Sequence, residues 1–112
     1  MCRVRNEALA VDTFSIYTSG VPFDWDETKR GATLATRGLD FADAPIVLDG
    51  VCVTFEDARR DYGEPRFITL GELVGRVVVV AWTQRNDVVR IISMRKANDR
   101  EKRLYRERLV QG

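Results

Sequence analysis

The sequence predicts an α+β fold: an antiparallel sheet of about four strands, with two helices before it and one helix after it. Three observations support this. Short apolar runs separated by turn residues fill the middle of the chain, helix-capping signals precede them, and a charged amphipathic segment follows them. The order helix, helix, strands, helix is typical of a sheet with helices packed on it.

The first helix is expected between Asp26 and Gly38. An aspartate accepts hydrogen bonds from the free amides at a helix start, and a glycine tolerates the left-handed turn that ends a helix. Between them, Ala32, Leu34 and Ala35 form a small apolar face that we expect to be buried.

A second helix is expected to start at Asp40, with Asp43 in its first turn. Pro45 follows where we expect it to bend or end the helix, because proline inside a helix lacks the amide proton and clashes with the preceding turn. This helix should therefore be brief.

Four apolar runs predict the strands, at residues 51–55, 66–70, 76–82 and 90–94. The third run is continuously apolar, which predicts a central strand covered on both faces. Gly71 to Gly75 and Gln84 to Asp87 are expected to form hairpin connections, so that the strands follow one another as an antiparallel meander.

The last helix is expected to start at Asn98, because Asn98 and Glu101 have the spacing of a capping box. Its Leu104, Tyr105 and Leu109 can face the core while its arginines face outward. Residues 21–112 are expected to form a single domain, and residues 1–20 an N-terminal extension with a short strand at residues 14–18.

Composition excludes several classes of function. The 112-residue chain has no histidine, which removes the commonest general base and the usual catalytic triads. Its two cysteines do not form a CxxC motif, so no metal site is expected. No apolar run reaches the length of a membrane span and no signal peptide is evident, so a cytoplasmic protein without membrane contact is expected.

Charge is distributed unevenly although the net charge is only +1. Residues 88–112 hold 8 of the 18 Lys/Arg and 3 of the 17 Asp/Glu, so the remainder of the chain is acidic. A basic end can attract phosphates, but a solvated amphipathic helix explains the same pattern.

Four segments together resemble the BrnT family of toxins from type II toxin–antitoxin systems. The first resembles the family's opening Phe, acid, Trp, Asp motif, and the last its Arg-Ile-Ile-Ser-Ala-Arg-Lys-Ala signature. They are Phe23–Lys29, Gly38–Ala44, Glu64–Gly71 and Arg90–Ala97, in the family's order and spacing.

The resemblance implies a RelE-like fold and a bacterial toxin that cleaves RNA. It also implies a BrnA-type ribbon-helix-helix antitoxin that caps the toxin, so that DNA is contacted only through the antitoxin. A homodimer within the larger complex would fit the family too. One departure concerns Arg37, which stands where the family usually has histidine at the end of the first helix, and Thr36, which replaces a lysine.

RNA can be cleaved without metal or cofactor when its own 2′-hydroxyl attacks the adjacent phosphorus. The protein then supplies a base, positive charge on the phosphate oxygens and an acid for the leaving oxygen. Arg66 and Arg95 are the first candidates for the charge, because a guanidinium binds two phosphate oxygens at once. Arg66 opens one strand and Arg95 ends another, so strand pairing is expected to bring them together.

Three further residues are candidates for catalysis, each with a plainer alternative. Lys29 is a candidate base or phosphate ligand, or a surface lysine paired with a nearby acid. Glu64 is a candidate base, or a partner of Arg66. Tyr105 is a candidate acid or stacking residue, or part of the core. The candidates for binding RNA are Arg37, Arg90, Ser93 and Lys96.

The leading hypothesis is therefore a metal-independent endoribonuclease toxin that inhibits translation and growth. The alternative is a catalytically weak or inactive RelE-like module that binds an antitoxin or nucleic acid. The missing histidine favours the alternative.

Overall fold

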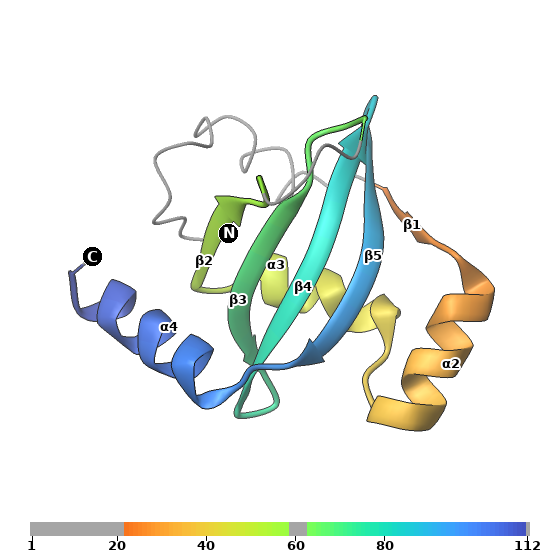
Figure 1. The fold of residues 1–112 in the computed structure, drawn as a ribbon. Coiled ribbons are helices and arrows are strands. Elements are labelled where there is room, and N and C mark those ends of the chain that lie inside the picture. The colour runs from red at the N-terminus through yellow and green to blue at the C-terminus, as the bar shows by residue number, and fades with distance from the viewer. Residues whose placement is uncertain (1–21, 59–62, 112) are drawn as a thin grey trace.

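Five strands form one mixed sheet in the order β1-β5-β4-β3-β2 (Figure 1). The computed structural model describes residues 22–58 and 63–111, so the strand expected at residues 14–18 lies outside the described residues. The elements are β1 (Phe23–Trp25), α2 (Glu27–Arg37), the 3₁₀ turn η2 (Phe41–Asp43), α3 (Ala44–Asp49), β2 (Cys52–Glu56), β3 (Phe67–Leu73), β4 (Arg76–Arg85), β5 (Val88–Lys96) and α4 (Asp99–Gln111).

The α+β class is confirmed, and the four predicted strands form an antiparallel meander from β2 to β5. The expected sheet of about four strands is incomplete, however, because β1 adds a fifth strand that pairs in parallel with β5. Phe23 lies beside Val89 and Trp25 beside Ile91. A three-residue strand with a distant partner has too few residues to show the alternation by which strands are recognised in a sequence.

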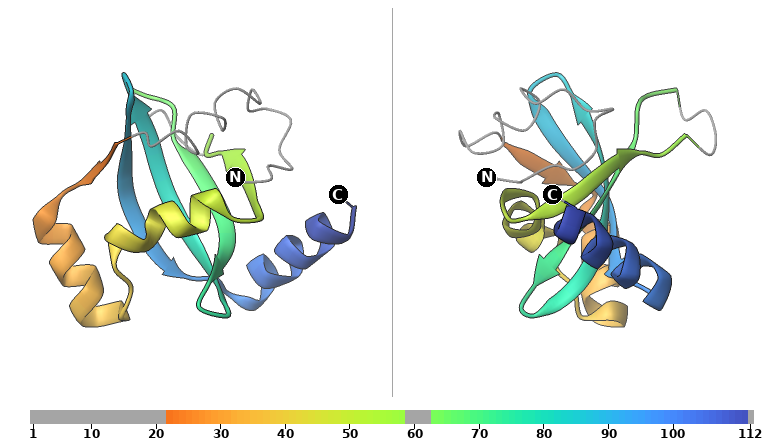
Figure 2. Two further views of the ribbon diagram at one scale, coloured as in Figure 1. Left: turned by 180° about the vertical axis from the view of Figure 1, so that it is seen from behind. Right: turned by 90° about the vertical axis from the view of Figure 1, so that its left-hand side faces the viewer.

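β4 lies in the middle of the sheet and is covered on both faces, as its apolar run predicts. Val78, Val80 and Trp82 point into one core, which is closed by η2 and α3, and Val79 points into the other, which is closed by α4. Figure 2 shows α3 and α4 on opposite faces of the sheet. We call these the α3 face and the α4 face.

α2 begins and ends as predicted, but the apolar face expected on it is wrong. The carboxylate of Asp26 accepts hydrogen bonds from the amides of Thr28 and Lys29, and Gly38 ends the helix with a φ of 69°. None of the helix residues is buried, and Leu34 is 44% exposed. Polar anchors hold the helix instead: Arg30 forms a bidentate ion pair with Asp40.

The second helical segment is divided in two. Asp40 caps η2 through the amide of Ala42, and α3 begins directly afterwards. Pro45 lies in the first turn of α3, where a missing amide proton costs nothing. The expectation that Pro45 disturbs the helix interior is therefore wrong, because the helix starts later than predicted.

Gly71 lies inside β3, rather than in the hairpin turn expected from Gly71 to Gly75, at the point where α3 crosses the sheet. A Cβ atom at this position would lie 2.8 Å from Val47 Cγ1 and 3.3 Å from Cys52 Cβ. The absent side chain therefore lets α3 approach the strand closely. The turn itself consists of Val74 and Gly75, both with positive φ.

α4 starts at the predicted capping box. Asn98 Oδ1 accepts a hydrogen bond from the amide of Glu101, and Glu101 Oε1 accepts one from the amide of Asn98. Tyr105 is buried, and Leu104 and Leu109 pack against the same core, as predicted. None of the helices in the described ranges is long and apolar enough to cross a membrane.

The close approach at Gly71 predicts opposite effects of the same substitution at two glycines. Gly71→Ala forces Val47 to move and should lower the free energy of unfolding by about 1–3 kcal/mol. Gly31→Ala, in the exposed middle of α2 with nothing near the added methyl group, should raise it by about 0.5–1 kcal/mol. Urea unfolding of the two variants measures both changes, and equal effects would contradict the packing described here.

Candidate nucleic-acid-binding face

Three guanidinium groups gather with two carboxylates at the end of the sheet where β4 runs into β5. We call these residues the arginine cluster: Arg66 just before β3, Arg85 at the end of β4, Arg90 in β5, Glu64 in the loop before β3, and Asp24 in β1. Two of the guanidinium groups, those of Arg66 and Arg90, belong to predicted site residues, and Glu64 is a third predicted residue.

Ion pairs connect the cluster. Arg85 binds Glu64 through two parallel hydrogen bonds, from Nε to Oε1 and from Nη2 to Oε2, each 3.0 Å long. Arg90 Nη1 lies 3.4 Å from Asp24 Oδ2. The pKa of Glu64 is lowered, chiefly by the hydrogen bonds from Arg85 and in addition by the charges of Arg66 and Arg90.

The strand register places the cluster on the α4 face. Arg90 lies opposite Thr83 in β4 and beside Asp24 in β1, and side chains that are cross-strand partners share a face. Thr83 adjoins Trp82, which points into the core on the α3 face, so Thr83 and its partners point the other way. Arg85, two residues further on, points in the same direction as Thr83.

A β-bulge in β5 is needed for this orientation. Ser93 pairs with Ala81 and Ile91 pairs with Trp82, so Ile92 has no partner on β4. With regular alternation from Met94, which is buried on the α3 face, Arg90 would point into that core as well. The extra residue reverses the alternation, and Arg90 points to the α4 face.

Thr83 also positions the loop that carries Glu64 and Arg66. Its side chain is buried, and Oγ1 donates a hydrogen bond to the carbonyl oxygen of Pro65, the residue between them. The loop is thereby held against β4 from the inside, while the Arg85–Glu64 pair holds it from the outside.

Of the described helices, α4 is the one that packs on this face, and it contacts β2 and β3 (Figure 1). The cluster lies beyond these contacts. Arg66 and Arg90 are partly exposed, and the Arg85 side chain is 54% exposed. The arginine cluster is therefore accessible from the side of α4 within the described part of the chain.

Arg66 and Arg95 do not meet, contrary to expectation. β3 and β5 both pair antiparallel with β4, so they run in the same direction. The start of β3 and the end of β5 therefore lie at opposite ends of the sheet. Arg95 pairs with Val79, four residues along β4 from Thr83, which corresponds to about 13 Å.

Arg95 has a structural partner at its own end of the sheet. Its Nη1 and Nη2 each lie 2.7 Å from an oxygen of Glu101, so the ion pair joins the end of β5 to the first turn of α4. These hydrogen bonds from Arg95 lower the pKa of Glu101. Ser93 lies between Arg95 and Arg90 on the same face and is half-buried.

The remaining predicted residues are scattered. Lys29 is exposed on α2, and Arg37 at the end of α2 donates a hydrogen bond of 2.8 Å to the carbonyl oxygen of Met94. Lys96 pairs with Val78 and so points to the α3 face. Tyr105 is buried and donates its hydroxyl to the carbonyl oxygen of Val51, and burial raises its pKa. Of the roles considered for Tyr105, its burial and its hydrogen bond to Val51 fit packing in the core.

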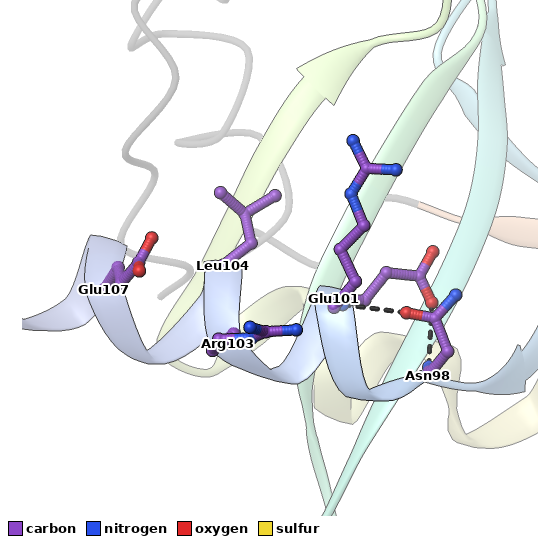
Figure 3. A pocket seen from close by; sticks show the side chains of 6 residues that line it. Asn98, Glu101, Arg103, Leu104 and Glu107 are labelled. Carbon is purple, nitrogen blue, oxygen red and sulfur yellow. Dashed lines mark hydrogen bonds between the residues drawn. The ribbon is translucent and has the colours of Figure 1, made fainter.

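The described residues also form a hollow along one side of α4 (Figure 3). Its charges are mixed, and the carboxylate of Glu101 is already engaged with Arg95 and Asn98. Its lining consists of Asn98, Arg100, Glu101, Arg103, Leu104 and Glu107. This hollow does not join Arg66, Arg95 and Lys29, so the single site expected from these three residues is not formed by the described part of the chain.

Sequence reasoning missed two members of the arginine cluster, Arg85 and Asp24. The sequence predicts a hairpin connection at Arg85, which instead ends β4, and its pairing with Glu64 joins residues 21 positions apart. Asp24 reaches Arg90 only because β1 pairs with β5, and no local pattern signals that pairing.

Fold and face together define a small α+β domain with a guanidinium-rich sheet face, an arrangement suited to phosphate groups. The family model described as "Ribonuclease toxin, BrnT, of type II toxin-antitoxin system" matches residues 25–101. The chain belongs to this family, which confirms the resemblance noted in the sequence. No curated protein matches the chain.

The Arg95–Glu101 pair predicts a pH-dependent contribution to stability. The folded-state pKa of Glu101 lies below its ordinary value of 4.5, so the pair stabilises the fold above that value, and the contribution is lost as the pH falls through the folded-state pKa. Glu101→Gln keeps the capping interactions. It should lower the free energy of unfolding by less than about 1 kcal/mol at neutral pH, since the pair is partly exposed, and should have no effect in strong acid.

Urea unfolding across the acidic pH range measures this difference. Glu107→Gln, an exposed position on the same helix, is the matched control and should change stability little at any pH. A Glu101→Gln effect that stays constant with pH would contradict the assignment to the ion pair.

Proposed function

We propose that this chain is an endoribonuclease toxin of RelE-like type, which cleaves RNA by attack of the 2′-hydroxyl on the adjacent phosphorus, without a metal ion, and so inhibits translation and growth. Membership of a family of ribonuclease toxins supports the proposal. The observation that carries it is the arginine cluster, in which Arg66 and Arg90, two predicted phosphate ligands, lie on one accessible face of the sheet.

Arg66 and Arg90 would hold the scissile phosphodiester and balance the negative charge that builds up on its oxygens in the transition state. Fixed guanidinium groups suit this role, because they need no reorganisation when the charge develops. Both are attached to a paired sheet rather than to a free loop: Arg90 lies within β5, and the carbonyl oxygen of Arg66 accepts a hydrogen bond from the amide of Asp57.

The structure argues against two of the three residues considered for the general base and the general acid. Glu64 is a poor base, because its two oxygens are bound by Arg85 and its pKa is lowered. Tyr105 is a poor acid, because it is buried and its hydroxyl is donated to Val51. Lys29 is the predicted residue that remains for the base; it lies on α2, which follows β1 directly, and it would have to reach a phosphate held by Arg66 and Arg90 from outside the arginine cluster.

Arg95 and Ser93 would contribute mainly to RNA binding along the α4 face, whereas Lys96 points to the α3 face and lies outside this binding surface. Arg95 lies on the same face as the arginine cluster, at the distance of a neighbouring part of the RNA chain rather than of the same phosphate. Arg37 already donates a hydrogen bond to Met94, so one side of its guanidinium remains to bind a phosphate.

The partners proposed for the toxin are RNA and a BrnA-type ribbon-helix-helix antitoxin. The antitoxin would neutralise the toxin and supply any DNA contact, within a complex that contains two copies of the toxin. Membership of a type II toxin–antitoxin family supports an antitoxin partner.

A second candidate function is a catalytically weak or inactive module that binds the antitoxin or nucleic acid. Two observations favour it. The chain has no histidine, and Arg37 stands where the family has one. In addition, Arg85 and Arg90 are ion-paired with carboxylates rather than left open for a substrate.

The nuclease proposal predicts a large loss of activity from one arginine. Arg66→Ala should reduce cleavage of single-stranded RNA by roughly a hundredfold or more, because one transition-state contact is removed. It should also abolish growth inhibition on induction in a bacterial host. Chelation of divalent metals should leave cleavage by the unaltered chain unchanged.

Arg76→Ala is the matched control, because Arg76 is an exposed arginine at the opposite end of the sheet and should retain full cleavage. Gel analysis of the RNA products measures all three cases. Tight binding of RNA or antitoxin by the unaltered chain, with no cleavage product, would establish the second candidate function instead.

A further inference from the structure

The two oxygens of Glu64 occupy the hydrogen-bonding edge of Arg85 that would bind a phosphate. Nε and Nη2 of Arg85 donate to separate carboxylate oxygens, each at 3.0 Å. A phosphodiester presents two anionic oxygens that can accept the same pair of hydrogen bonds. The carboxylate of Glu64 therefore resembles a bound phosphate, because it is anionic and accepts the same two hydrogen bonds.

The surroundings of this pair are those of an anion site. Arg66 and Arg90 are close enough for their charges to lower the pKa of Glu64. Asp24 is close enough to raise the pKa of Arg85, after the larger effect of Glu64. The arginine cluster thus holds three fixed positive charges and two carboxylates, a balance of one positive charge. This balance becomes more positive by one each time a carboxylate moves away.

The Arg85–Glu64 ion pair is weak enough for a phosphodiester to replace the carboxylate of Glu64. Arg85 is 54% exposed and Glu64 23% exposed, and an ion pair this open to water contributes little to stability, because water and salt screen it. A phosphodiester that also contacts Arg66 and Arg90 gains more than one such interaction. When the Glu64 pair opens, the loop keeps its second attachment, because Thr83 still holds Pro65 from the buried side.

We propose that Arg85 is a further phosphodiester-binding residue of the face, and that Glu64 is its internal competitor, displaced when single-stranded RNA binds. The inference rests on the proposed function and adds to it a ligand residue and a carboxylate that limits RNA affinity. Asp24 acts on Arg90 in the same way but more weakly, through one contact of 3.4 Å from a carboxylate that is 52% exposed.

The test measures binding of the full chain to a short 2′-O-methyl oligonucleotide, which cannot be cleaved by 2′-hydroxyl attack, over a range of salt concentrations. Glu64→Gln removes the competing charge and should raise the affinity at low salt by about three- to tenfold. Arg85→Ala should reduce the slope of log affinity against log salt by about 0.7, the value for one phosphate contact on a single strand.

Glu72→Gln and Arg76→Ala are the matched controls at the far end of the sheet, and both should leave affinity and slope unchanged. In the Arg85→Ala background, Glu64→Gln should raise the affinity clearly less than it does in the unaltered chain, because the hydrogen-bonded competition acts through Arg85 and only the weaker effect of the Glu64 charge on Arg66 and Arg90 remains. Arg85→Lys keeps the charge without the two-pronged geometry and should fall between the unaltered chain and Arg85→Ala. Thermal unfolding confirms that each variant is folded.

Three results would overturn the inference: unchanged or weaker binding by Glu64→Gln, an unchanged salt slope for Arg85→Ala, or a gain from Glu64→Gln that is as large in the double variant as in the single variant. Cleavage of unmodified RNA is assayed separately. If the binding results are as expected and no RNA is cleaved, the phosphate-binding role of Arg85 is supported and the proposed nuclease function is wrong. If RNA is cleaved, but Glu64→Gln and Arg85→Ala bind the oligonucleotide like the unaltered chain, the inference about Arg85 and Glu64 is wrong while the proposed nuclease function is retained.

Discussion

The pairing of β4 with strands on both sides is the constraint on which the rest of the structure depends. Because β3 and β5 are both antiparallel to β4, they run in the same direction, and this decides which of their ends lie together. Arg66 at the start of β3 and Arg90 near the start of β5 share one end, and Arg95 is carried to the other. The buried side chains of Val78, Val80 and Trp82 stabilise β4 in this central position.

The two ends of the α4 face then serve different purposes. At one end the bidentate Arg95–Glu101 pair and the capping interactions of Asn98 secure the first turn of α4. At the other end the arginine cluster is exposed, and its carboxylates neutralise much of its charge. An isolated arginine-rich surface would attract any polyanion, so internal carboxylates favour ligands that can contact several guanidinium groups at once. The sheet thus separates by position the arginine that holds α4 from the arginines proposed to bind phosphate.

Several elements could be predicted because their signals are local. Asp26 and Gly38 bound α2, and Asn98 with Glu101 starts α4, since a cap depends on residues within one turn. The apolar run of β4 predicts its place in the middle of the sheet. β1 could not be predicted, because three residues gain strand structure only from a distant partner. The burial of Ala32, Leu34 and Ala35 was predicted wrongly, because polar anchors such as Arg30 with Asp40 hold α2.

By itself the sequence determined the fold class, both ends of α2, the start of α4, the central strand and the family, because each is recorded in neighbouring residues or in motifs of fixed spacing. Tertiary structure alone decided which charged residues meet. The direction of β3 and β5 separated Arg66 from Arg95, the unpaired Ile92 turned Arg90 onto the α4 face, and a contact across 21 residues joined Arg85 to Glu64. The physical reason is that strand direction, register and bulges are set by pairing between distant segments, while a sequence pattern reports only the preferences of each segment.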